Sequence, residues 1–192
     1  PGKKEGQFIV NPGKLPRERL LDLCSLCHGG QLNKTKPSFS FKAGDTLSNY
    51  FTFPPPDPNI NNIDVHGNQM GLLTSSKCFT LGKVTCLNCH NTHENEKDQV
   101  ALFSQRCQSC HSAGHEKTCG LAASNGSIIA KNCLDCHMPK QPSHAIAVYL
   151  RHENDPTPAQ LRTHYITIYP ELTEQVLAML RKAKPEGDKQ TK

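Results

Sequence analysis

Hydrophobic residues follow a helical pattern in two stretches of this chain, one near each end. The first begins at Pro16, and proline suits the first position of a helix because no amide partner is needed there. A leucine-rich stretch over residues 20–23 follows, and the glycine pair at 29–30 ends the segment. Residues 1–14 are polar and rich in Gly, Pro and Lys. The pattern therefore predicts an extended lead-in followed by one helix.

The second helical pattern lies near the C-terminus. Its apolar residues recur at the spacing of one helix face: Leu172, Val176, Leu177 and Leu180. Pro170 and Glu171 mark the start, and the helix is expected to end before Pro185.

Between residues 31 and 77 no strong helical or strand period occurs. The segment is rich in proline and contains five aromatic residues: Phe39, Phe41, Tyr50, Phe51 and Phe53. A structureless loop of this length is unusual in a compact domain. A disordered linker is one interpretation, but such segments are usually poor in aromatic residues.

One five-residue motif, Cys-x-x-Cys-His, occurs four times. Its copies are Cys24, Cys27 and His28; Cys86, Cys89 and His90; Cys107, Cys110 and His111; and Cys133, Cys136 and His137. The motif is typical of c-type haem attachment, in which two thiols form thioethers with the porphyrin and the histidine ligates iron. Cysteines three positions apart share one face of a helical turn, so a short helix is expected at each copy. Disulfides or zinc knuckles are the alternative, and four repeats favour haem.

Composition supports a fold built on four covalently attached haems. Only 35% of the 192 residues are apolar, there is no Trp, and Gly and Pro number 13 and 14. A chain of this composition cannot bury a hydrophobic core of ordinary size. We expect a mainly α fold with much irregular structure, in which short helices and long loops pack around the haems. The aromatic segment would wrap over porphyrin faces, and the chain without haem would be largely unfolded.

The formal charge of +5 changes once the cofactors are counted. Haem propionates make the loaded protein near neutral when oxidised and acidic when reduced, and no dense Lys/Arg run predicts nucleic-acid binding. Covalent haem attachment takes place outside the cytoplasm, so a periplasmic or extracellular protein is expected. No signal peptide precedes Pro1, and no apolar run predicts a transmembrane segment, so we expect a processed protein or an excised domain.

Six of the ten histidines lie outside the motifs and are candidates for the second axial position of each iron. We assign this role to His66, His93, His144 and His152. Gly67 would let the backbone beside His66 approach a flat cofactor, and His93 follows a motif closely enough to point at a neighbouring haem. A surface or hydrogen-bonded histidine is the alternative for each.

The remaining candidates stay open at this point. His115 and His164 either ligate iron or are structural, and methionine ligation by Met70, Met138 or Met179 is a minority option. Cys78 and Cys119 lie outside the motifs, and in an oxidising compartment they are expected to form a disulfide, with two free thiols as the alternative.

Several segments resemble one family of bacterial multihaem cytochromes c. They are residues 75–79, residues 84–93 around the second motif, and residues 133–140 around the fourth; residues 41–45 and the His66–Gly67 pair also fit. The chain is similar, over about residues 10–155, to relatives of the tetrahaem cytochrome of ammonia oxidisers, especially the versions fused to tetratricopeptide repeats. The resemblance implies mostly bis-histidine haems in stacked pairs, with His66, His93, His144 and His152 as second ligands.

The sequence thus predicts a tetrahaem domain over residues 1–155 and a helical extension over 156–192 packed on it. The leading function is an electron carrier that exchanges electrons with redox partner proteins, such as other multihaem cytochromes. Two alternatives remain: a haem enzyme acting on a small nitrogen compound at one open iron, or the repeating subunit of an extracellular cytochrome filament. The first motif is separated from the second by 57 residues, so we expect haem 1 to depend most on distant parts of the chain for its second axial ligand.

Overall fold

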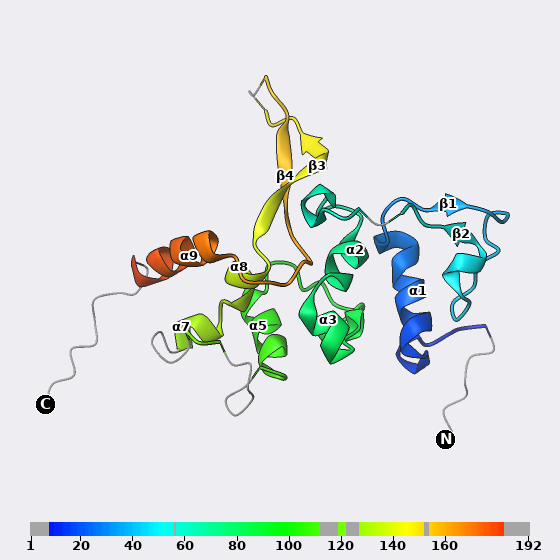
Figure 1. Cartoon of the computed structure of the whole chain (residues 1–192), viewed down its shortest axis with the longest axis horizontal. Helices are drawn as coiled ribbons and strands as arrows, with labels where there is room; N and C mark the ends of the chain where they lie inside the picture. Colours follow the sequence, from blue (N-terminus) through cyan, green and yellow to red (C-terminus); the bar gives the residue numbers. More distant parts are fainter. Residues whose placement is uncertain (1–7, 56, 112–118, 122–126, 152–153, 183–192) are drawn as a thin grey trace, which may run out of the picture. The chain divides into compact units, whose positions relative to one another are not determined.

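The computed structural model describes residues 8–55, 57–111, 119–121, 127–151 and 154–182. The chain forms two compact units. Figure 1 labels the helices and strands along the chain. Unit 1 comprises Pro1–Asn95 and Lys140–Ile166, and unit 2 comprises Glu96–Pro139 and Thr167–Lys192. Residues after 139 contribute to both units, and the expected tetrahaem domain over residues 1–155 with an extension over 156–192 stays a prediction.

The predicted N-terminal helix is confirmed as α1, Arg17–His28. Pro16 is its N-cap, one residue before the expected position, and Gly29 follows its last residue. A 3-10 helix, Pro12–Lys14, precedes it. Leu20 and Leu21 are buried, so the leucine-rich stretch forms the packed face of α1.

The segment after α1 is mainly irregular, with short regular elements. Strands β1 (Asn33–Lys34) and β2 (Phe51–Thr52) pair antiparallel, and 3-10 turns occupy Leu47–Asn49 and Ile60–Asn62. Helices α2 (Gln69–Thr74) and α3 (Lys77–Gly82) then lead to α4 (Cys86–Cys89). Leu47 and Leu72 are fully or almost fully buried and anchor this segment within unit 1.

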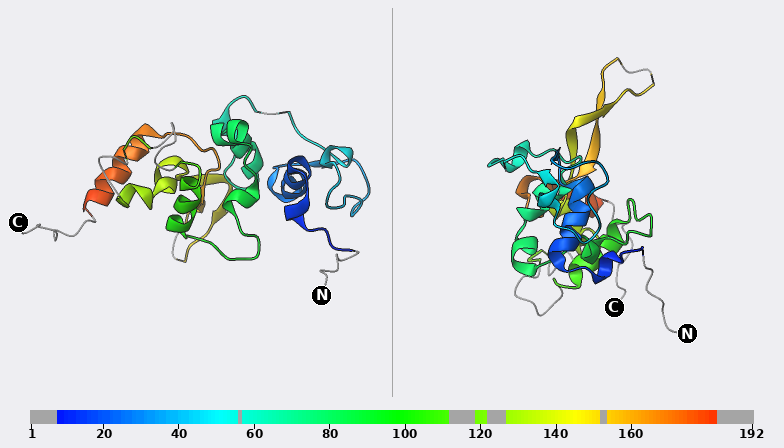
Figure 2. Two further views of the ribbon diagram at one scale, coloured as in Figure 1. Left: turned by 90° about the horizontal axis from the view of Figure 1, so that it is seen from below. Right: turned by 90° about the vertical axis from the view of Figure 1, so that its right-hand side faces the viewer.

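A β-hairpin completes unit 1, and the sequence pattern did not predict it. Strand β3 (Lys140–Val148) pairs antiparallel with β4 (Thr157–Arg162) (Figure 2). The register shifts between Pro142 and Ala147, where β3 has more residues than β4. Such a bulge re-aims the side chains within it, and here it contains His144.

Unit 2 consists of four described helices. They are α5 (Val100–Gln108), α7 (Ser127–Ala130), α8 (Cys133–His137) and α9 (Pro170–Lys182). The predicted C-terminal helix is confirmed as α9, which packs on α8 through its buried residue Leu177. Helix α5 packs against α7 and α8.

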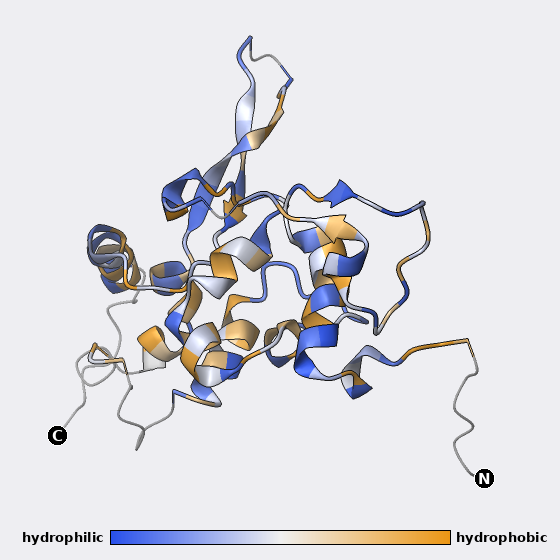
Figure 3. Ribbon diagram, turned by 45° about the vertical axis from the view of Figure 1, so that its right-hand side comes forward, coloured by the Kyte–Doolittle hydropathy of each residue, from blue (hydrophilic) through white to orange (hydrophobic). Residues whose placement is uncertain are grey.

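The overall class is a mixture of helices, irregular segments and small sheets, so the expected mainly α, irregular fold is confirmed except for the sheets. Hydrophobic and polar residues alternate over short distances along most helices (Figure 3). Nine hydrophobic side chains are buried in the described part of the chain, a small core for its length.

Candidate haem centres

All four Cys-x-x-Cys-His motifs lie on helical turns, as their spacing predicts. The first occupies the last turn of α1, the second coincides with α4, and the fourth forms α8. The third begins in α5 and continues the turn beyond it, because the amide of His111 donates to the carbonyl of Cys107 at 3.0 Å. In every copy the two thiols therefore project from one turn, as thioether attachment requires.

The first motif histidine is oriented by a glutamine. His28 Nδ1 lies 3.3 Å from Gln69 Oε1, and Gln69 Nε2 donates to the carbonyl of Val65 at 3.3 Å. Because that second bond uses the amide nitrogen of Gln69, its oxygen faces the imidazole. His28 Nδ1 must then carry the proton, which leaves Nε2 free to bind a metal.

The fourth motif histidine has the same arrangement with a backbone partner. His137 Nδ1 lies 2.8 Å from the carbonyl oxygen of Thr167. A carbonyl only accepts, so Nδ1 is again the protonated nitrogen and Nε2 is the ligand atom. Two of the four motif histidines are thus held in the tautomer that haem iron requires.

Unit 1 brings the first and second motifs together despite the long segment between them. The Cys86 thiol hydrogen-bonds Cys24, which lowers the pKa of Cys24 to about 7 and raises that of Cys86. Arg17 supports this pairing from the start of α1. Its guanidinium lies 4.5 Å above the Phe79 ring and donates to the carbonyls of Lys83, at 3.1 Å, and of Val84, at 3.4 Å.

Unit 2 pairs the third and fourth motifs in the same way. A hydrogen bond from Cys107 lowers the pKa of Cys133 to about 6. The fully buried Ser104 of α5 accepts a hydrogen bond at 3.0 Å from the Cys133 amide, at the start of α8. The two helices that carry these motifs are therefore joined at their cysteines.

One carboxylate positions the loops of two predicted second ligands. Asp64 accepts hydrogen bonds from the amide of His66 at 2.7 Å, from the amide of His144, and from the Ser143 hydroxyl at 2.9 Å. The Ala145 amide also donates to it, at 3.2 Å. Burial opposes ionisation of Asp64, but these hydrogen bonds outweigh it and lower its pKa. His66 and His144 are exposed, and both belong to unit 1.

The His66 loop lies beside the first motif. The Gly30 amide donates to the Gly67 carbonyl at 2.9 Å, and both glycines have φ near +80° (81° and 82°). That conformation is strained for residues with a Cβ, and at Gly30 an added Cβ would also lie 2.9 Å from the Asn68 side chain. At Gly67 it is the backbone angle that favours glycine, since an added Cβ would meet no atom within 4 Å, and the approach of this backbone to a cofactor stays a prediction.

Of the other two predicted second ligands, the structure describes His93 but not His152. His93 is exposed, and its amide donates to the Asn91 side chain at 3.1 Å in a tight turn. His152 and the undecided His115 lie outside the described residues. In the described part of unit 2, the only histidines are the two motif histidines, His111 and His137.

His164 is the histidine that sequence reasoning left undecided and that the structure places beside a motif. Its ring lies 6.1 Å from that of His90, centroid to centroid, with 24° between the ring planes. Burial, followed by the proximity of His90 and His28, lowers the pKa of His164 to about 4, so its imidazole is neutral. The buried Nδ1 atom of His164 has no hydrogen-bond partner among the described residues.

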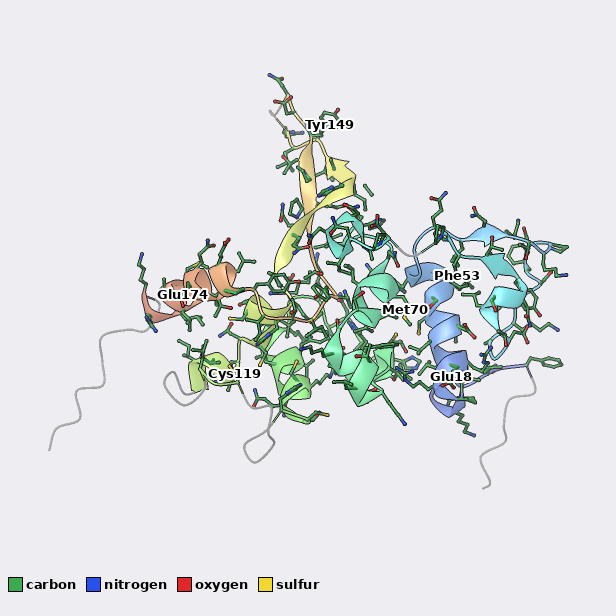
Figure 4. All side chains as sticks on the ribbon, in the orientation of Figure 1. Glu18, Phe53, Met70, Cys119, Tyr149 and Glu174 are labelled. Carbon is green, nitrogen blue, oxygen red and sulfur yellow. The ribbon has the colours of Figure 1, made fainter. Side chains whose placement is uncertain are left out.

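The expected disulfide between Cys78 and Cys119 is wrong for this structure, in which both are free thiols. Cys78 lies on α3 in unit 1, where burial raises the pKa of its thiol. Cys119 belongs to unit 2 and lies near enough to Cys136 to raise the pKa of that thiol slightly, after the larger effect of burial (Figure 4). The two cysteines therefore have separate surroundings, and an even number of remaining cysteines did not imply a bond.

The aromatic segment folds back on itself near the first motif. The rings of Phe41 and Tyr50 meet edge to face at 5.6 Å, and the Tyr50 hydroxyl donates to Asp45 at 2.8 Å. Leu26, within the first motif, lines the same small cavity as Phe41 and Tyr50. Phe39 is 100% exposed, with a left-handed backbone. Packing of these rings against porphyrin stays a prediction.

The residues present fit covalently bound haem. The paired thiols on helical turns and the motif histidines, of which His28 and His137 are held with Nε2 as the free nitrogen, are the donor set that haem c uses. No cluster of three or more His, Cys, Asp or Glu side chains suited to a metal ion occurs in the described ranges. Haem iron takes four ligands from porphyrin, so it needs no such cluster. Within the same ranges, no helix has the length and apolar character needed to cross a membrane.

Comparison with known proteins gives no relative to set beside these motifs: no protein-family model, no curated protein and no solved structure matches the chain significantly.

Proposed function

We propose that this protein is an electron carrier with four covalently attached c-type haems, mostly or all bis-histidine. It would work in the periplasm or outside the cell, as the multihaem cytochromes c that it resembles do. When bound, each haem supplies an iron that is reversibly reduced by one electron. The single observation that carries the proposal is the pairing of the motifs, first with second and third with fourth, through their leading cysteines.

The pairing matters because electrons pass efficiently only between closely spaced centres. Cys24 and Cys86 are adjacent although 57 residues separate their motifs, so the fold of unit 1 gives two haem anchors a common location. Cys107 and Cys133 give unit 2 a second shared location. An isolated haem enzyme would need only one such anchor, whereas a carrier benefits from adjacent ones.

The protein's own contribution is orientation. Gln69 and the Thr167 carbonyl hold the imidazoles of His28 and His137 with Nε2 as the ligand atom. Hydrogen bonds to Nδ1 also make the ligating nitrogen more basic, which is one way in which a protein tunes iron potentials. Asp64 holds the loops that carry His66 and His144, the two described candidates that lie on one hydrogen-bonded network. Each of these contacts fixes a ligand before iron is bound.

The proposal is tested on protein secreted by a host that attaches c-type haem. The pyridine haemochrome assay and intact mass should give four haems per chain. Electron paramagnetic resonance of the oxidised protein should show low-spin iron throughout, and the reduced protein should return electrons to an added cytochrome c. A chain that carries no covalent haem would overturn the proposal. Tight carbon monoxide binding by the reduced wild-type protein would instead favour an open, catalytic haem.

A further inference from the structure

Two histidines from distant parts of unit 1 face each other beside the second motif. His90 is the motif histidine, and His164 follows strand β4. Their ring centroids are 6.1 Å apart and their planes are inclined by 24°.

That separation matches two imidazoles on opposite sides of one metal. A histidine nitrogen binds a transition metal at about 2 Å, and the ring centre lies roughly 1 Å further out, so the centroids of a trans pair are about 6 Å apart. From this geometry we propose that His164 is the second axial ligand of the haem attached at Cys86 and Cys89. The inference rests on the proposed function and names one ligand within it.

The surroundings of His164 support this role. Stacking of aromatic rings also occurs at about 4.5–7 Å, and it is the simpler reading of the contact. The Nδ1 atom of His164 is buried and has no hydrogen-bond partner among the described residues, so stacking on His90 alone does not explain a histidine at this position. A hydrogen bond with the Arg162 backbone helps to orient the His164 ring beside His90, as a second axial ligand would require.

The backbone of His164 is held on both sides. The Ser76 hydroxyl, fully buried, donates to the His164 carbonyl at 3.1 Å and accepts from the Ile166 amide at 2.8 Å. Thr163, 1% exposed, accepts from the Tyr165 amide through its hydroxyl at 3.1 Å. A ligand held by its neighbours in this way needs no rearrangement to reach the metal.

The assignment changes the set of second ligands expected from the sequence. If His164 serves the second haem, then His66, His93, His144 and His152 exceed by one the three positions that remain. One of these four is then a structural histidine. His115 is required as an axial ligand only if two of the four are structural.

The test replaces His164 with Ala in the secreted holoprotein, with Ile168→Ala as the control. Ile168 lies on the same stretch and its side chain is 69% exposed. His164→Ala should keep four haems, because Cys86 and Cys89 are intact. One of the four ferric centres should become high-spin, one carbon monoxide should bind per reduced chain, and added imidazole should restore the low-spin signal. Ile168→Ala should match the wild type.

A second variant covers the case in which the alanine protein does not accumulate. His164→Met retains a ligand atom and should give one haem with the near-infrared charge-transfer band of methionine-ligated iron. Absence of this band in a folded four-haem protein overturns the inference, as does a low-spin spectrum for all four haems of His164→Ala.

The identity of the haem is tested by adding His164→Ala to a chain that carries Cys86→Ala and Cys89→Ala. The three-haem parent lacks the second haem, so the added substitution should create no further high-spin centre. A new high-spin centre would assign His164 to another haem and overturn the pairing with His90. These outcomes leave the electron-carrier proposal standing, because that proposal is tested separately, by the haem content and carbon monoxide binding of the wild-type protein.

Discussion

The backbone amide of His144 donates a hydrogen bond to the carboxylate of Asp64, 80 residues earlier in the chain. This contact joins the bulge in strand β3 to the loop that carries His66. The two predicted ligands thus depend on one side chain that is not itself a ligand. Removing its charge should affect both loops at once.

Asp64→Asn should therefore lower the free energy of unfolding of the holoprotein by about 1–3 kcal/mol, the usual range for hydrogen bonds to a charged group. The asparagine amide nitrogen would face backbone amides that can only donate. Asp57→Asn is the matched control, because Asp57 bonds only nearby residues, the Asn59 amide at 2.8 Å and the Asn62 side chain at 3.0 Å. Denaturant titration measures both, and equal losses would contradict a special role for Asp64.

The Asp64 contribution should also depend on pH in a defined direction. Folding lowers the pKa of Asp64 below its ordinary value of 3.8, so the unfolded chain takes up the proton more readily. The stabilisation is therefore complete above the unfolded-state pKa and is lost as the pH falls through the folded-state pKa. Thermal unfolding of wild type and Asp64→Asn should differ most at neutral pH and converge in acid. A difference that grows in acid would refute the assignment.

Ser76→Ala should destabilise unit 1 by about 1–3 kcal/mol, because the part-buried Ile166 amide loses its acceptor. The adjacent Ser75→Ala is the control, since the Ser75 hydroxyl makes a local bond to the Gly71 carbonyl at 3.2 Å and is exposed. If His164 is a ligand, Ser76→Ala should also broaden the low-spin resonance signals while four haems remain. An unchanged unfolding curve would show that Ser76 does not hold this segment.

Arg17→Lys should lower stability by about 1–2 kcal/mol although the charge is kept, because a lysine cannot donate to several carbonyls from a planar fork. The comparison is Arg19→Lys, whose ion pair with Asp22 at 2.7 Å can survive the change and is worth at most about 1 kcal/mol. Since Arg17 joins α1 to the carbonyls before the second motif, its loss should also weaken coupling between the first two haems. Redox titration monitored by absorbance would detect this.

The two cysteines outside the motifs should be dispensable. Cys78→Ser and Cys119→Ser should each retain four haems and unfold at the wild-type temperature, because both are free thiols. A disulfide between them would instead be worth about 3–4 kcal/mol, and either substitution would then lower the unfolding temperature markedly. Intact mass and thermal unfolding distinguish the two results.

Leu177→Ala should destabilise the packing of α9 on α8 by about 2–5 kcal/mol, because this side chain is only 4% exposed. Met179→Ala, at a position 60% exposed on the same helix, should have little effect. Proteolysis of the folded protein would report the change, since a loosened α9 is cleaved sooner.

The sequence by itself determined the local features. Helices α1 and α9 followed from leucine spacing and from proline and glycine at their ends, and four helical turns followed from the Cys-x-x-Cys-His motif, because these signals act within a few residues. The β3–β4 hairpin was missed: its register is shifted at a bulge whose His144 and Ala145 amides bond Asp64, far away in the chain.

Only the tertiary structure decided which distant residues meet. It set Cys24 beside Cys86, separated Cys78 from Cys119 into different units, and brought His164 opposite His90. Each of these relationships depends on where the chain returns after a long segment. The periodicity of hydrophobic residues along the sequence does not predict that position. Residue type could name His164 as a candidate, but its place beside His90 depends on the chain that follows β4, which the Ser76 hydroxyl holds through residues 164 and 166.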